Sequence, residues 1–192
     1  MSKKRKEKRR QSPAQKSKAA QKKTMIIYYV AVIGFALAYH IISNQEWFMS
    51  LAEPIFRGYA HIGSAILNLF GEGAEAIGVA IRSPHFGLTI KEGCDAITPM
   101  ILYSMAILAF PISFKLKWPG FILGILILFV LNIIRIISLY YIGKHFSYET
   151  FDFMHVDVWQ VLFLIVTIFI WLLWMRWALI TKSTSAQVPK DS

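Results

Sequence analysis

The sequence contains a single cysteine, Cys94, and only 11 acidic residues among its 192 positions. One cysteine excludes an internal disulfide and any metal site built from several cysteines. The first long apolar segment follows a basic tail and lacks a small-residue cleavage site, so we expect no cleaved signal peptide. The 21 Lys and Arg residues outnumber the acidic ones and leave a formal net charge of +10.

Most of this positive charge lies in residues 1–24, which contain one acidic residue, Glu7, and almost no apolar ones. No aromatic residue accompanies these basic side chains and no folded nucleic-acid-binding module is apparent, so we expect no nucleic-acid partner. We predict a disordered cytoplasmic tail that sets the membrane topology and contacts anionic lipid. A second disordered cytoplasmic tail, which is polar, is expected at 182–192.

Long apolar runs are what the sequence has in excess. Its hydrophobic fraction of 56% exceeds the ~45–50% of soluble domains, and several runs approach the ~20 residues that a bilayer core requires. The sequence therefore predicts an all-α integral membrane protein, with a multi-pass membrane domain over 25–181. The four expected transmembrane helices are residues 25–43, 96–112, 119–143 and 157–180.

The segment 51–70 has helical apolar spacing but also a charged face. Glu53, Arg57 and His61 recur at four-residue intervals on that face. This pattern favours an interfacial or re-entrant helix over a lipid-exposed span.

After this helix, apolar residues alternate on both sides of a Ser-Pro-His-Phe-Gly turn. Alternation around a turn of this composition is typical of two paired strands. We predict a small extracytoplasmic β-hairpin with strands near 77–82 and 87–91.

Charge also predicts the orientation in the membrane. By the positive-inside rule, the basic tail, Lys115, Lys117, Arg176 and Lys182 all belong on the cytoplasmic side. The four expected spans satisfy every one of these constraints, provided that 51–70 stays on the outer side. We therefore expect a multi-pass protein of the cell's inner (plasma) membrane, with both termini cytoplasmic.

Cys94 lies at the expected outer end of the 96–112 helix. Asp95 can cap this helix, and a thiol near a helix N-terminus feels the positive end of the helix dipole, which favours the nucleophilic thiolate. The charge of Asp95 opposes that ionisation. The alternative for a free cysteine is the role of a small buried hydrophobe.

Arg135 stands in an apolar span, where an unpartnered arginine costs at least ~2.5 kcal/mol on insertion scales. Asn132 and Ser138 fall three residues to either side and share its helical face. A polar face within an apolar span is expected to point into the bundle. The alternative is that the arginine side chain extends to the membrane interface.

His155 lies between Asp152 and Asp157, just before the last expected span. A histidine oriented by a carboxylate can serve as a general base. The alternatives are an ordinary loop histidine or a metal site formed with the two aspartates, whose spacing matches no recognised ligand pattern. We expect no metal and no other cofactor. Four other histidines are assigned no role: His40, His61, His85 and His145.

Cys94, Arg135 and His155 are distant in the sequence but are expected at the same membrane face. A cysteine with a histidine is the usual combination for covalent acyl transfer, in which a cation can hold the oxyanion. The sequence thus predicts Cys94 as the nucleophile, His155 as the general base and proton donor, and Arg135 as the stabilising cation.

The order of these motifs resembles the exosortase/archaeosortase family over roughly residues 50–175. The matching features are the cysteine at the outer start of a membrane helix, the Asn132-x-x-Arg135 motif in the next, and the histidine before the last. The stretches "EGCDAI" and "HVDVWQ" look most like the small bacterial form, exosortase H. The resemblance implies a cysteine protease or transpeptidase-like enzyme. Its substrates would be exported, membrane-anchored proteins with a C-terminal sorting signal, comprising a short motif, a transmembrane helix and a basic cluster.

Two other functions fit the same residues. One is a non-enzymatic membrane scaffold for envelope or exopolysaccharide-linked protein assembly, in which Arg135 binds a partner helix. The other is a small transporter or channel subunit, in which Arg135 lies in an aqueous path. Both should tolerate Cys94→Ser, whereas a cysteine transferase should lose all turnover.

Overall fold

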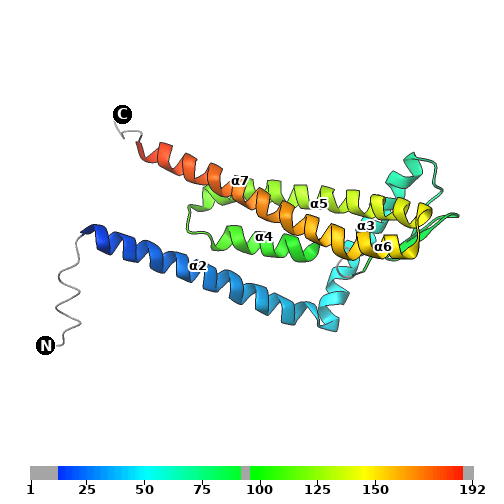
Figure 1. Ribbon diagram of the computed structural model, residues 1–192, viewed down its shortest axis with the longest axis horizontal. Coiled ribbons are helices and arrows are strands. Elements are labelled where there is room, and N and C mark those ends of the chain that lie inside the picture. Colours follow the sequence, from blue (N-terminus) through cyan, green and yellow to red (C-terminus); the bar gives the residue numbers. More distant parts are fainter. Residues whose placement is uncertain (1–12, 92–95, 188–192) are drawn as a thin grey trace.

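The computed structural model describes residues 13–91 and 96–187, and it is mostly helical (Figure 1). Its long helices are consistent with the apolar runs of the sequence. In chain order the helices and strands are α2 (Pro13–Ser43), α3 (Glu46–Leu69), β1 (Glu75–Ile77), β2 (Ala80–Arg82), β3 (Gly87–Thr89), α4 (Ile97–Ala109), α5 (Phe114–His145), α6 (Tyr148–Phe153), the π-helical turn η1 (Met154–Val158) and α7 (Trp159–Gln187).

Helices α4, α5 and α7 pack against one another, and α2 packs along α4. The start of α2, the α4–α5 connection and the end of α7 lie at one end of this bundle, while the sheet and α6 lie at the other (Figure 1). This arrangement is the one that the expected topology requires. Helix α2 begins at Pro13, so it extends into the segment that was assigned to the basic tail.

Within residues 13–91 and 96–187, three helical segments are long and apolar enough to cross a membrane: Lys18–Ser43, Phe114–His145 and Tyr148–Thr184. The fourth expected span is not confirmed. Helix α4 has 13 residues, which cover only ~20 Å at 1.5 Å per residue, against a hydrocarbon core of ~30 Å.

Helix α3, which includes the 51–70 segment, is not among the three candidate spans. Its charged face is present as expected. Arg57 donates to Glu53, with 2.6 Å between Nη2 and Oε1, and both side chains are exposed.

The expected two-stranded hairpin is instead a three-stranded antiparallel sheet with the order β1-β2-β3. The turn between β2 and β3 falls where it was predicted, with Ser83 N donating to Phe86 O at 3.1 Å. The predicted first strand, 77–82, was wrong, because the chain reverses within it. Gly78 adopts a φ of +61°, which glycine tolerates better than other residues, and this turn separates β1 from β2.

The side chains form two apolar cores. One lies between α3, the sheet and the C-terminal half of α5, and the other lies between α2, α4, α5 and α7. We call the end of the bundle that carries the sheet its outer end. In the second, Tyr103 of α4 donates to the carbonyl of Gly120 at 2.8 Å. A Cβ atom on Gly124 would lie 2.1 Å from the Tyr103 ring, so glycine is what permits this close contact of α4 with α5.

Candidate functional site

Arg135 is buried on α5, with 5% of its surface exposed. Its Nη2 donates to the backbone carbonyl of His155 at 3.1 Å, and its guanidinium carbon lies 5.6 Å from the centre of the Phe163 ring. The expectation that this polar face points into the bundle is therefore confirmed. The arginine joins the middle of α5 to the start of α7, so two of the predicted site residues are in direct contact.

Asn132, one turn before Arg135, has no exposed surface. Among the described residues, neither its Oδ1 nor its Nδ2 has a hydrogen-bond partner. Leaving a buried amide unsatisfied costs ~1–3 kcal/mol, and groups of this kind call for an explanation other than stability. The Asn132–Arg135 face is therefore the strongest candidate for a functional site.

His155 lies in η1, between α6 and α7. Its ring is partly buried and stacks on Phe151, with 5.7 Å between ring centres. Single π-helical turns inside longer helices are frequent at functional sites. Asp152 and Asp157 are both exposed, but only Asp152 lines the same cavity as His155, so Asp152 is the better candidate for orienting the imidazole.

Two cavities adjoin these residues. The outer cavity, of about 590 Å³, lies between β3 and the corner joining α5 to α6, and it includes His155. The inner groove, of about 550 Å³, is mostly apolar, lies between α4 and α7, and includes Arg135. Because Arg135 donates to the carbonyl of His155, this hydrogen bond joins the lining of one cavity to that of the other.

Cys94 and Asp95 lie outside the described residues. On one side of them in the sequence, Lys91 lines the outer cavity, and on the other side Ala96 lines the inner groove.

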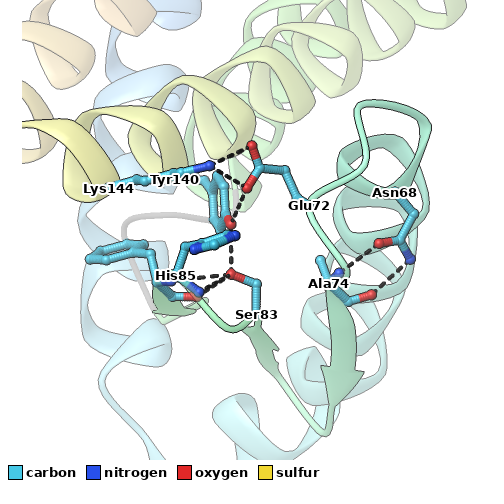
Figure 2. A network of polar contacts seen from close by, with 8 residues as sticks. Asn68, Glu72, Ala74, Ser83, His85, Tyr140 and Lys144 are labelled. Atoms are coloured by element: carbon cyan, nitrogen blue, oxygen red, sulfur yellow. Dashed lines mark hydrogen bonds and ion pairs between the residues drawn. The ribbon is translucent and has the colours of Figure 1, made fainter.

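A polar cluster that the sequence analysis missed joins the loop after α3 to the outer end of α5 (Figure 2). Lys144 Nζ donates to both carboxylate oxygens of Glu72, at 2.8 and 2.6 Å. Tyr140 donates to Glu72 at 2.9 Å and shares a hydrogen bond of 2.6 Å with Ser83. The hydrogen bonds from Lys144 lower the pKa of the Glu72 carboxyl. We call Glu72, Ser83, Tyr140 and Lys144 the polar clamp.

The sequence carried little signal for the clamp, because Glu72 and Tyr140 are 68 positions apart and no periodicity links them. His85, which was assigned no role, lies beside the clamp in Figure 2. As for metals, the described part of the chain contains no group of three or more His, Cys, Asp and Glu side chains able to hold an ion.

Fold and site together define a multi-pass helical membrane protein with a buried polar site near one end of its bundle. Residues 20–173 match the model of the transmembrane exosortase family (Exosortase_EpsH). The chain therefore belongs to this family of membrane sorting enzymes, as the motif order led us to expect. No curated protein and no solved structure matches the chain in the corresponding comparisons.

Proposed function

We propose that this protein is a membrane-embedded cysteine protease or transpeptidase that cleaves the C-terminal sorting signal of exported, membrane-anchored proteins. The family carries the general assignment, since exosortases act on proteins to be sorted. One observation supports the specific site above all others: the buried Arg135 guanidinium, which lines the inner groove, contacts the backbone of His155, which lines the outer cavity. A substrate that leaves the membrane there would meet both residues.

In the proposed reaction, the Cys94 thiolate attacks the carbonyl carbon of the scissile peptide bond, and Arg135 stabilises the resulting oxyanion. The C–N bond then breaks, and the His155 imidazolium gives its proton to the departing amine. The product is a thioester between Cys94 and the exported part of the substrate. An incoming amine or water, deprotonated by His155, attacks this thioester and restores the thiol.

The inner groove suits the membrane-spanning part of such a substrate. Its lining is mostly apolar and comes mainly from α2, α4 and α7, with Tyr28, Leu102 and Leu164 as examples. The transmembrane helix of the sorting signal would lie along these side chains, and its basic cluster would emerge at the opposite, cytoplasmic end of the bundle.

We also propose that the site faces the outside of the inner (plasma) membrane and that both termini are cytoplasmic. A cysteine introduced at Ser147, in a Cys94→Ala background, should react with a membrane-impermeant thiol reagent in intact cells. A cysteine introduced at Lys115 should react only after the cells are opened. Labelling of the Lys115 position from outside would overturn this orientation.

The proposed activity can be tested with a library of membrane-anchored reporters. Each reporter joins an exported epitope-tagged domain to a randomised extended segment, an apolar helix of ~20 residues and a basic cluster. The wild-type protein should cleave a subset of the library. Cys94→Ala and Cys94→Ser should cleave none of it while remaining inserted in the membrane.

His155→Ala should also abolish cleavage, and His145→Ala is its matched control. His145 lies near the outer end of α5, stacks on Tyr141 and does not line the outer cavity. Cleavage that survives in Cys94→Ala would exclude the cysteine mechanism. If the wild type cleaves no reporter, and Cys94→Ala cells show no measurable defect compared with wild-type cells, the scaffold function would be favoured.

A further inference from the structure

We propose that the open edge of β3 binds the substrate as an added β-strand, holding the extended segment of the sorting signal by its backbone along the outer cavity. This inference rests on the proposed function for the class of ligand, a membrane-anchored polypeptide. It identifies the surface that binds the extended segment of the sorting signal just outside the membrane.

The hydrogen-bonding register determines which backbone groups of β3 are available. Ile90 N donates to Val79 O, and Ser83 N donates to Phe86 O. Hydrogen-bonded pairs alternate in an antiparallel ladder, so Leu88, which is paired with Ile81, directs its N–H and C=O toward β2.

By the same alternation, Gly87 and Thr89 direct their backbone N–H and C=O groups away from β2. Strand β3 is at the edge of the sheet, so no further strand lies on that side. None of the hydrogen bonds found among the described residues uses these four groups. A row of unpaired backbone donors and acceptors of this kind is a template for pairing with another strand.

The available edge of β3 borders a cavity and is not surrounded by bulk solvent. Phe86, Gly87, Leu88, Thr89 and Lys91 form one wall of the outer cavity of about 590 Å³. The opposite wall comes from the α5–α6 corner and from η1, including Phe146, Phe151 and His155. An extended peptide in this space would pair with β3 on one side and pass the His155 imidazole on the other.

The direction of β3 matches that of the proposed substrate. β3 follows Phe86, which packs at the outer end of α5, and leads toward Ala96, which lines the membrane groove beside Arg135. A substrate that runs from its exported domain into its transmembrane helix travels the same way. The added strand would therefore pair in parallel with β3, and its membrane end would arrive near the contact between Arg135 and His155.

Backbone pairing can be tested by removing one edge N–H. Thr89→Pro deletes an outward-facing donor without deleting a β2–β3 hydrogen bond, and edge positions tolerate proline for this reason. Reporter cleavage should fall about tenfold, because the substrate loses one backbone hydrogen bond and the proline ring crowds the edge. Thr89→Val retains the N–H, so it should lose less cleavage than Thr89→Pro does.

The matched control is Ala76→Pro on the opposite edge of the sheet. Since Ala80 and Arg82 face β1, the N–H of Ala76 faces away from β2, as that of Thr89 does. Ala76→Pro should leave cleavage unchanged, because β1 does not line the outer cavity. An equal loss in both proline variants, or an equal loss in Thr89→Val and Thr89→Pro, would overturn the proposal.

Crosslinking measures substrate binding independently of cleavage. Thr89→Cys in a Cys94→Ala background should form disulfides with single cysteines placed along the extended segment of a reporter. Strand pairing predicts a maximum at every second reporter position, since alternate side chains lie on one face. Crosslinks without this alternation, or none, would refute β3 pairing even if wild-type cleavage upholds the proposed function. Alternating crosslinks, together with cleavage that is retained in Cys94→Ala, would uphold β3 pairing and refute the proposed cysteine mechanism.

Discussion

Two polar clusters on the same helix, α5, differ in how completely their hydrogen bonds are satisfied. In the polar clamp, near the outer end, Glu72 receives hydrogen bonds from both Lys144 and Tyr140. At the Arg135 site, deeper in the bundle, the amide of Asn132 is fully buried and has no hydrogen-bond partner among the described residues. Satisfied buried networks stabilise a fold, whereas unsatisfied groups cost stability and are retained for another reason.

The polar clamp and the Arg135 site have different roles, although their composition alone would not distinguish them. Both clusters contain a buried or partly buried cation on α5, Lys144 in one and Arg135 in the other. The lysine is held by a carboxylate, and the arginine by a backbone carbonyl and an aromatic ring. A buried guanidinium that contacts the histidine backbone can act on a developing oxyanion, so we propose a chemical role for the Arg135 cluster and a stabilising role for the polar clamp.

The largest effect is expected from Arg135→Lys. A lysine ammonium is a point charge and cannot reproduce the planar fork of donors of the guanidinium. Reporter cleavage should fall about 100-fold, close to the loss in Arg135→Ala, since removing an oxyanion donor costs on the order of 10²–10³ in rate. Cleavage is measured by the loss of the reporter's anchored form.

The control for this change is Arg57→Lys. Arg57 is exposed on α3 and pairs with Glu53, and an exposed pair of this kind contributes little. Arg57→Lys should cleave normally. If Arg135→Lys also cleaved at a substantial rate, Arg135 would be acting only as a generic positive charge.

Asn132→Leu should have the next largest effect and should move activity and stability in opposite directions. Leucine has the same branched shape and number of side-chain heavy atoms and removes the unsatisfied amide, so the free energy of unfolding in detergent should rise by about 1 kcal/mol. Cleavage should nevertheless fall at least tenfold if the amide serves the reaction.

Asn68→Leu provides the contrast, because the Asn68 amide is satisfied. Its Nδ2 donates to Ala74 O at 2.8 Å, and its Oδ1 accepts from Ala74 N at 2.6 Å. Asn68→Leu should lower the free energy of unfolding by about 1 kcal/mol and leave the cleavage rate of the folded protein unchanged. A destabilised Asn132→Leu protein would instead mean that Asn132 stabilises the fold.

Local patterns predicted the features that depend on neighbouring residues. The apolar runs gave the three long helices, and the three-residue spacing of Asn132 and Arg135 gave a buried polar face. The β2–β3 turn followed from the composition of residues 83–87. Each of these depends on side chains within one or two helical turns, or on a single turn of backbone.

Features that depend on distant contacts were not predictable in this way. The clamp joins Glu72 to α5 across 68 positions, and the open edge of β3 exists only because the sheet ends there. The split of the predicted strand 77–82 depended on one positive φ, at Gly78. Helix α4 ends at Ala109, before the apolar run does, so its length could not be taken from hydropathy.

Within the clamp, Glu72→Gln should have a smaller effect, and on stability alone. The amide keeps the shape of the carboxylate but loses its charge, so Lys144 loses its ionic partner. The melting temperature in detergent should fall by a few degrees, and the cleavage rate of the folded protein should stay at the wild-type level. A loss of cleavage without loss of stability would erase the distinction between the clamp and the Arg135 site.

The smallest expected effect is the pH dependence of that same stabilisation. The pKa of Glu72 is lower in the folded protein than its ordinary value, because Lys144 donates to the carboxylate. A lowered carboxyl pKa adds stability above the ordinary pKa of ~4.3, and this stability is lost as the pH falls toward the folded-state pKa.

The difference in melting temperature between wild type and Glu72→Gln should therefore be constant from neutral pH down to about pH 5 and should shrink below it. Glu53→Gln is the control, since Glu53 is exposed on α3 and forms only a surface ion pair. Its difference from wild type should be small at every pH. A Glu72 difference that already disappears near neutral pH would instead assign the effect to a group other than the Glu72 carboxylate. The lysine–carboxylate pair would then not be the group that stabilises the outer end of α5.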